Sequence, residues 1–190
     1  RYFSPDGPLQ IPMPMVNIIS GGAHANRTMD IQDVLVVPVG AKTFTQALSW
    51  IVAIREMAAK LGKEDGKVTN LIADEGGLAI SFTSIEKACE FVVTAIEKVG
   101  LNVGSQVGLA LDIAATQFYD GSNYNLATMG KIYNQSEYLQ FINSLVSNQP
   151  IISIEDPFAE DDWQSWQEFS SQMPAKLQLL GDDLLTTNLD

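Results

Sequence analysis

Three short apolar segments of the chain each end in a carboxylate. They are residues 107–112 (VGLALD), 151–155 (IISIE, followed by DP) and 177–183 (LQLLGDD). Apolar runs of this length are typical of strands that are buried on both faces in a parallel sheet. We therefore expect Asp112, Glu155 and Asp182 to emerge at the carboxyl ends of strands and to meet at one edge of the sheet.

Three carboxylates at one edge repel one another, and this repulsion raises their pKa values unless a cation compensates it. Mg²⁺ prefers oxygen ligands, accepts several carboxylates and keeps positions for water or substrate. The pattern therefore predicts a Mg²⁺ site. Each acid taken alone is also explained as the N-cap of the helix that follows its strand.

Other polar residues lie in loops or at a strand end, where a side chain can reach a substrate. Glu75 belongs to a glycine-rich segment, residues 74–77 (DEGG), where a carboxyl near a metal-bound anion can act as a general acid. His24, the only histidine, lies in a loop of small residues that can close over an anionic substrate. Gln32 and Asp33 occur near the start of a second strand. Each also has a simpler explanation. The DEGG segment can be read as an acidic turn, His24 as a surface histidine, and Gln32 and Asp33 as ordinary polar residues at a strand edge.

Apolar periodicity indicates the elements that position these residues. We expect strands at 15–19, 31–39, 107–111, 151–154 and 177–180, and a hairpin that turns at Asp120 and Gly121. Capping residues and glycines predict four helices: from Thr43 (with Gln46) to Gly62, from Thr83 (with Glu86) to Gly100, from Asn134 through Val146, and one that begins at Asp161.

This alternation of strands and helices predicts an α/β fold with parallel strands and right-handed crossovers. A complete (β/α)8 barrel takes about 250 residues, so we expect this chain of 190 residues to form part of such a barrel with about five strands. Residues 1–14 contain four prolines and are expected to be an entry or linker segment, and residues 15–190 are expected to be the N-terminal part of the barrel domain.

Composition excludes several classes of function. The net charge of -12, from 11 basic and 23 acidic residues, argues against nucleic acid as a partner. No apolar run is long enough to span a bilayer, so we expect no membrane segment and no membrane partner. A single cysteine, Cys89, excludes an intrachain disulfide framework and fits a reducing cytoplasm. Its place on an apolar helical face predicts a structural thiol.

Six segments, in order, resemble those of enolases: PMPMVNIISGGAHA, DIQDVLVVPVGA, ADEGGLA, LALDIAATQFY, SIEDPFAEDDW and LLGDDLLTTN. The resemblance covers nearly the whole chain from about residue 12 to residue 188. It implies the first part of the enolase barrel, whose second strand runs antiparallel to the others. It also implies a cytoplasmic glycolytic lyase, phosphopyruvate hydratase, that acts with Mg²⁺ on a small molecule and is a homo-oligomer, usually a dimer, at full length.

The resemblance also assigns roles to residues. The implied reaction is the reversible dehydration of 2-phosphoglycerate to phosphoenolpyruvate. The metal ligands would be Asp112, Glu155 and Asp182, of which Glu155 and Asp182 also border the substrate. Glu75 would be the general acid that protonates the departing hydroxide, and the substrate-binding or assisting residues would be His24, Gln32 and Asp33.

The sequence departs from the enolase pattern at three positions. Asp33 stands where enolases usually have glutamate, which retracts the carboxylate by one methylene, and Ala73 and Ile80 replace the usual glycine and proline around the DEGG segment. The lysine base, further phosphate-binding groups and the N-terminal domain of enolases have no counterpart in these 190 residues, so the chain alone is expected to be inactive. Two alternatives are a catalytically silent enolase-like scaffold or binding protein and another lyase of the superfamily that abstracts a proton next to a carboxylate.

Overall fold

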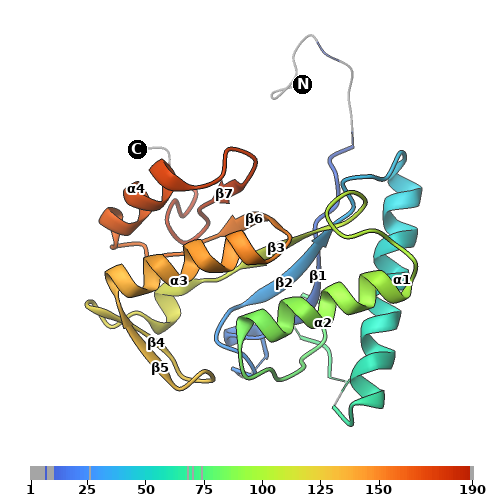
Figure 1. The fold of residues 1–190 in the computed structure, drawn as a ribbon, viewed down its shortest axis with the longest axis horizontal. Coiled ribbons are helices and arrows are strands. Elements are labelled where there is room, and N and C mark those ends of the chain that lie inside the picture. The colour runs from blue at the N-terminus through green and yellow to red at the C-terminus, as the bar shows by residue number, and fades with distance from the viewer. Residues whose placement is uncertain are drawn as a thin grey trace.

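The computed structural model describes residues 7, 11–25, 27–67, 69, 71–73 and 75–188. Five strands form one curved sheet in the order β1-β2-β3-β6-β7 (Figure 1). Their bounds are Val16–Ser20 for β1, Asp33–Val37 for β2, Gly108–Asp112 for β3, Ile151–Glu155 for β6 and Gln178–Leu180 for β7. The sheet stays open, with β1 and β7 as its edges, as in part of a barrel.

The second strand, β2, runs in the opposite direction to both of its neighbours in the sheet. β2 pairs antiparallel with β1 and with β3, whereas β3 pairs parallel with β6, and β6 pairs parallel with β7. The antiparallel second strand that the enolase resemblance implies is therefore confirmed. The alternation of elements alone predicts parallel strands throughout, and this is wrong for β2. As a result, the beginning of β2 lies beside the end of β3.

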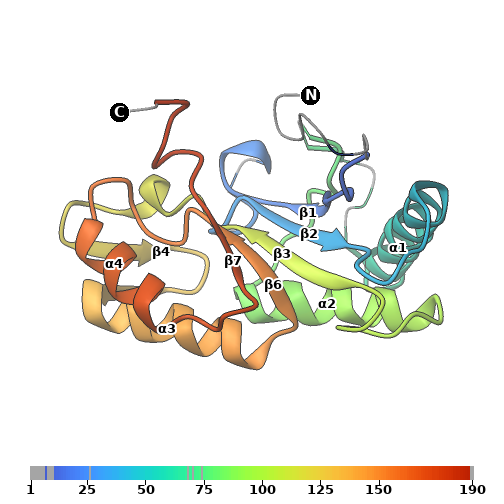
Figure 2. The ribbon, with the colours of Figure 1, turned by 90° about the horizontal axis from the view of Figure 1, so that it is seen from above.

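Four helices cover the sheet: α1 (Phe44–Glu64), α2 (Ile85–Lys98), α3 (Gln135–Asn148) and α4 (Trp163–Gln172). Figure 2 shows α2 and α3 running along one side of the sheet. The buried faces of α1, α2 and α3 contribute Ile54, Val92 and Ile142, respectively, to the core, and each of these side chains is fully shielded from solvent. Burial of such a side chain stabilises the fold by about 1.5–3 kcal/mol. Among the described residues no helix is both long enough and apolar enough to cross a membrane.

Cys89 lies inside this core on α2. It is fully buried, and burial, with the charges of Glu86 and Glu90, raises the pKa of its thiol to about 12. A thiol with so high a pKa stays protonated at neutral pH and is a poor nucleophile. The prediction of a structural cysteine is confirmed.

The N-caps of the helices agree with the sequence at two helices and differ by one residue at the other two. Thr43 and Asn134 cap α1 and α3, and Asn134 forms a complete capping box with Glu137. At α2 the cap is Ser84, which accepts from the Lys87 backbone N–H, and not Thr83. At α4 the cap is Asp162, not Asp161. Both errors have one cause: two adjacent residues have equivalent capping groups, and the buried apolar face decides which of them precedes the first turn.

Gly62 was expected to end the first helix, and this is wrong. The helix continues to Glu64, and the left-handed residue after its cap is Gly66, with a φ of 70°. Gly62 is instead buried within the helix, where an added Cβ would lie 2.6 Å from Cγ2 of Thr69. Because glycine has no Cβ, Thr69 can pack directly against the helix at Gly62. The expected stop at Gly100 is confirmed by its φ of 80° just after α2.

The hairpin forms one turn later than expected. A tight turn does occur at Asp120 and Gly121, where the Asp120 carboxylate accepts from the backbone N–H of Ser122 and Asn123. The ladder beside it, however, is a single bridge between Tyr119 and Tyr124. The paired strands are β4 (Asn123–Leu126) and β5 (Lys131–Asn134), joined by residues 127–130. A short 3-10 helix, η2 (Ala115–Phe118), links β3 to this hairpin.

Candidate metal centre

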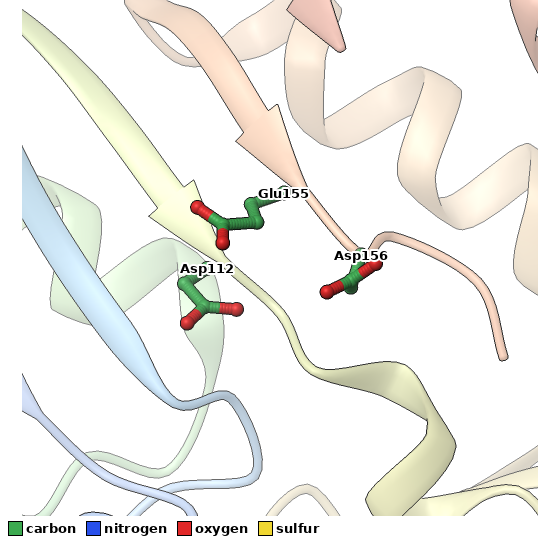
Figure 3. Close-up of side chains that lie close together, drawn as sticks. All are labelled: Asp112, Glu155 and Asp156. Carbon is green, nitrogen blue, oxygen red and sulfur yellow. The ribbon is translucent and has the colours of Figure 1, made fainter. Parts of the chain in front are cut away.

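Two carboxylates end adjacent parallel strands in register. Asp112 is the last residue of β3, Glu155 is the last residue of β6, and the two are paired across the strands. Figure 3 shows their side chains close together at the tips of the two strands. With Asp156, the residue after Glu155, they form a group in which one carboxylate oxygen from each lies within 4.8 Å of the others. The sequence prediction that Asp112 and Glu155 meet is confirmed.

Asp156 was not among the candidate residues. It is buried, with a φ of 40°, and its carboxylate already has partners. Oδ2 accepts from the backbone N–H of Asp182 at 3.1 Å and of Asp183 at 2.8 Å, and Oδ1 accepts from that of Leu184 at 3.4 Å. Asp156 therefore fixes the turn that follows β7. These three bonds satisfy the Asp156 carboxylate without a cation. Asp156 therefore holds the turn that carries Asp182, and it is less available than Asp112 or Glu155 as a metal ligand.

Asp182 lies in that turn, two residues beyond the end of β7. Its side chain is exposed and is outside the group of three carboxylates. Its charge nevertheless raises the pKa of Glu155, after the larger effects of burial and of Asp156. The structure therefore places Asp182 near Glu155, at the rim of the sheet that the ends of β3 and β6 form. Its role as a metal ligand stays a prediction.

Burial and, to a smaller extent, repulsion between carboxylates disfavour the charged forms of Asp112 and Glu155. Burial, followed by the charges of Glu155, Asp33 and Asp156, raises the pKa of Asp112 from 3.8 to about 8. Burial and neighbouring acids also raise the pKa of Glu155. Groups shifted in this way hold a proton or bind a cation instead. Because the donors are all carboxylate oxygens, the group fits a hard divalent ion such as Mg²⁺.

The antiparallel direction of β2 brings its first residue, Asp33, and the preceding Gln32 to the same rim. Asp33 pairs with Asp112 across the strands, and its buried carboxylate accepts a hydrogen bond from the Ser20 hydroxyl. Gln32 donates from Nε2 to Oδ2 of Asp112 at 3.0 Å. This bond favours the charged form of Asp112 and opposes the rise of its pKa. Both residues predicted near the substrate thus lie beside the proposed metal ligand.

Glu75 reaches the rim on the loop between α1 and α2. Leu78 of this loop bridges to Ile19 of β1, and the Leu78 backbone N–H donates to the Ile18 carbonyl at 2.9 Å. The Glu75 side chain is exposed and accepts from Nδ2 of Asn17 at 2.8 Å. Its charge contributes to the raised pKa of Glu155. Asp74 lies outside the described residues.

His24 lies in a short 3-10 turn, η1 (Ala23–Ala25), directly after β1. Two backbone bonds hold the start of this loop over the beginning of β2: the Gly21 N–H donates to the Gln32 carbonyl at 2.7 Å, and the Gly22 N–H donates to the Met29 carbonyl at 2.9 Å. The backbone of His24 is thus at the same rim as Asp112. The side chain of His24 lies outside the described part of the structure.

Comparison with known protein families gives a match for this chain. The family model described as enolase, C-terminal TIM barrel domain, matches residues 8–190.

Proposed function

The chain belongs to the enolase C-terminal TIM barrel family, and from this premise we propose that it contributes the Mg²⁺ ligands and the general acid of an enzyme that reversibly dehydrates 2-phosphoglycerate to phosphoenolpyruvate. The observation that carries the proposal is the pairing of Asp112 with Glu155 at the ends of two parallel strands, within one group of carboxylates. Strand ends of this kind form the active-site face of barrel enzymes.

Each residue of the rim receives a role in this proposal. Asp112, Glu155 and Asp182 hold Mg²⁺. When bound, Mg²⁺ offsets the negative charge that develops on the substrate carboxylate as its α-proton is removed, a reaction that enzymes of this superfamily carry out with a Lys or His base. Glu75, held by Asn17, protonates the departing hydroxide.

The residues of β2 and η1 position the substrate. Gln32 keeps the Asp112 carboxylate oriented and charged, because its amide donates to Oδ2. Asp33 and His24 border the substrate or assist the general acid. Carried over from the family, the enzyme is a cytoplasmic homodimer in glycolysis. The net charge of -12 argues against nucleic acid as a partner.

The test is formation of phosphoenolpyruvate by the full-length protein, followed as a rise in ultraviolet absorbance after addition of 2-phosphoglycerate. We expect a rise that stops when EDTA is added and returns with excess Mg²⁺. The Asp112→Asn variant should show no rise, whereas Glu97→Gln, which alters an exposed acid on α2, should match the wild type. A wild-type protein that forms no product with Mg²⁺ present would exclude the proposed function.

A second function is favoured by one observation. Asp33 is one methylene shorter than the glutamate that enolases usually have, and its buried carboxylate accepts a hydrogen bond from the Ser20 hydroxyl. If this bond withholds the carboxylate from the substrate, the protein binds the ligand without turning it over and acts as a silent, enolase-like binding protein. The variant Asp33→Glu separates the two functions, because it would create turnover only in a silent protein.

A further inference from the structure

Gln117 is a polar residue of η2 to which neither the motifs nor the proposed function assigns a role. Both the nitrogen and the oxygen of its side-chain amide form hydrogen bonds. Nε2 donates to Oε1 of Gln32 at 2.7 Å, and Oε1 accepts from the backbone N–H of Ala23 at 3.3 Å. Gln32 in turn donates from Nε2 to Oδ2 of Asp112 at 3.0 Å.

These bonds have one consistent direction. The Ala23 N–H donates to Gln117, Gln117 donates to Gln32, and Gln32 donates to Asp112. The acceptor at one end is a carboxylate of the candidate metal centre, and the donor at the other end belongs to the loop of His24. Because each amide offers one donor group and one acceptor group, a change at Gln117 affects which end of Gln32 faces Asp112.

The two residues before Gln117 are held by the segment that follows β6. The Ala115 N–H donates to the Asp156 carbonyl at 3.1 Å, and the Glu160 N–H donates to Oγ1 of Thr116 at 3.0 Å. The next residue, Phe118, packs edge-on against Tyr124 and Tyr138 in the core. The η2 turn is thus anchored on both sides of Gln117, which fixes the point from which its side chain reaches across to β2.

The loop of His24 is packed closely against the same two amides. Gly22 has a φ of 47°, and a Cβ added to it would lie 3.1 Å from Cα of Gln32 and 3.3 Å from Oε1 of Gln117. A side chain at position 22 would push the loop away from both residues. The glycine therefore permits the Ala23 N–H to reach Gln117.

We propose that Gln117 is a positioning residue that links the metal-site carboxylate Asp112, through Gln32, to the loop that carries His24. This inference deepens the proposed function and rests on it for the identity of the metal. Its physical content is that Gln117 keeps the Gln32 amide donating to Asp112 and holds the loop through the same side chain. Ordering of the loop and metal binding then depend on one another.

The test uses the full-length protein and the near-isosteric variants Gln117→Met, Gln32→Met and the double variant, with Gln140→Met on the exposed face of α3 as the control. Mg²⁺ affinity is measured by calorimetric titration. Loss of an outer-shell partner of a metal ligand costs about 10–100-fold in affinity; Gln117 is one bond further away, so we expect Gln117→Met to weaken Mg²⁺ binding roughly threefold to tenfold.

The double variant distinguishes a specific link from a general loss of stability. If Gln117 acts through Gln32, Gln117→Met has no further effect on Mg²⁺ affinity in the Gln32→Met background, a non-additivity expected of residues in one network. An unchanged affinity in Gln117→Met, or the same loss in both backgrounds, would overturn the proposal. Gln140→Met should bind Mg²⁺ as the wild type does.

Amide exchange at Ala23, followed by NMR without Mg²⁺, tests the link independently of the metal and of turnover. We expect faster exchange in Gln117→Met, which removes the acceptor, and also in Gln32→Met, which removes only the partner of that acceptor. Unchanged exchange in Gln32→Met would overturn the link. A protein that forms no phosphoenolpyruvate but shows both accelerations would refute the proposed dehydration and leave the link supported.

Discussion

Replacement of Asp112 by asparagine should change how the stability of the metal-free protein depends on pH. The pKa of Asp112 is raised from 3.8 to about 8 by burial and by the charges of Glu155, Asp33 and Asp156. Between about pH 4 and pH 8 the folded protein therefore retains a proton that the unfolded chain releases. Because the folded state binds more protons, its stability is full below this window and is lost as pH rises through it.

The size of the effect follows from the shift. One retained proton gives a slope of about 1.4 kcal/mol per pH unit, so the loss between about pH 5 and pH 8 has an upper limit of roughly 4 kcal/mol. Asp112 is only partly shielded from water and accepts a bond from Gln32, which favours its charged form. Allowing for solvent screening, we expect a loss of about 2 kcal/mol over that range.

The assay is urea unfolding of the full-length protein in EDTA at several pH values. Asp112→Asn mimics the protonated side chain, so it should lose much less stability over this range than the wild type. Asp65→Asn, at the exposed end of α1, should retain the wild-type slope. Saturating Mg²⁺ should abolish the wild-type loss, because the cation replaces the proton. Equal slopes in the wild type and in Asp112→Asn would refute the electrostatic account of the site.

Four further substitutions test the site and the contacts around it. Glu155→Gln should weaken Mg²⁺ binding strongly, whereas Glu75→Gln should bind Mg²⁺ nearly as the wild type does and yet lose turnover; equal Mg²⁺ affinity in Glu155→Gln and the wild type would refute the ligand assignment. Asp156→Asn removes a charged acceptor of three backbone N–H groups, so it should cost about 1–3 kcal/mol and speed proteolysis after β7; an unchanged cleavage pattern would contradict this. Gly77→Ala places a Cβ against the Ser20 hydroxyl and should lower the free energy of unfolding by about 1–3 kcal/mol, and a variant as stable as the wild type in urea would contradict this contact.

The sequence predicts the pairing of Asp112 with Glu155 because strand period and strand end are local properties. An apolar run followed by an acid marks where a buried strand stops, and parallel neighbours align such ends. The same reasoning misjudges β2, because the direction of a strand depends on the connections and packing around it. The correct direction came from the family resemblance, and it is this direction that brings Gln32 and Asp33 to the rim.

Asp156 and Gln117 show what the sequence does not reveal. Asp156 follows Glu155 directly, so the pair of acids was a visible signal, but the residue that turns inward depends on the left-handed backbone at Asp156. Gln117 carries no signal of its own, because its role depends on where η2 places it beside Gln32, which is 85 residues away in the chain. Side-chain networks between distant segments arise only when the tertiary structure forms.

The most direct test of the metal centre is a crystal structure of the full-length protein with Mn²⁺ in place of Mg²⁺, with the ion located by its anomalous scattering. We predict one ion bound by carboxylate oxygens of both Asp112 and Glu155. The same map decides whether Asp182 or Asp156 supplies a further ligand. An ion that binds elsewhere, or that contacts neither Asp112 nor Glu155, would contradict the account.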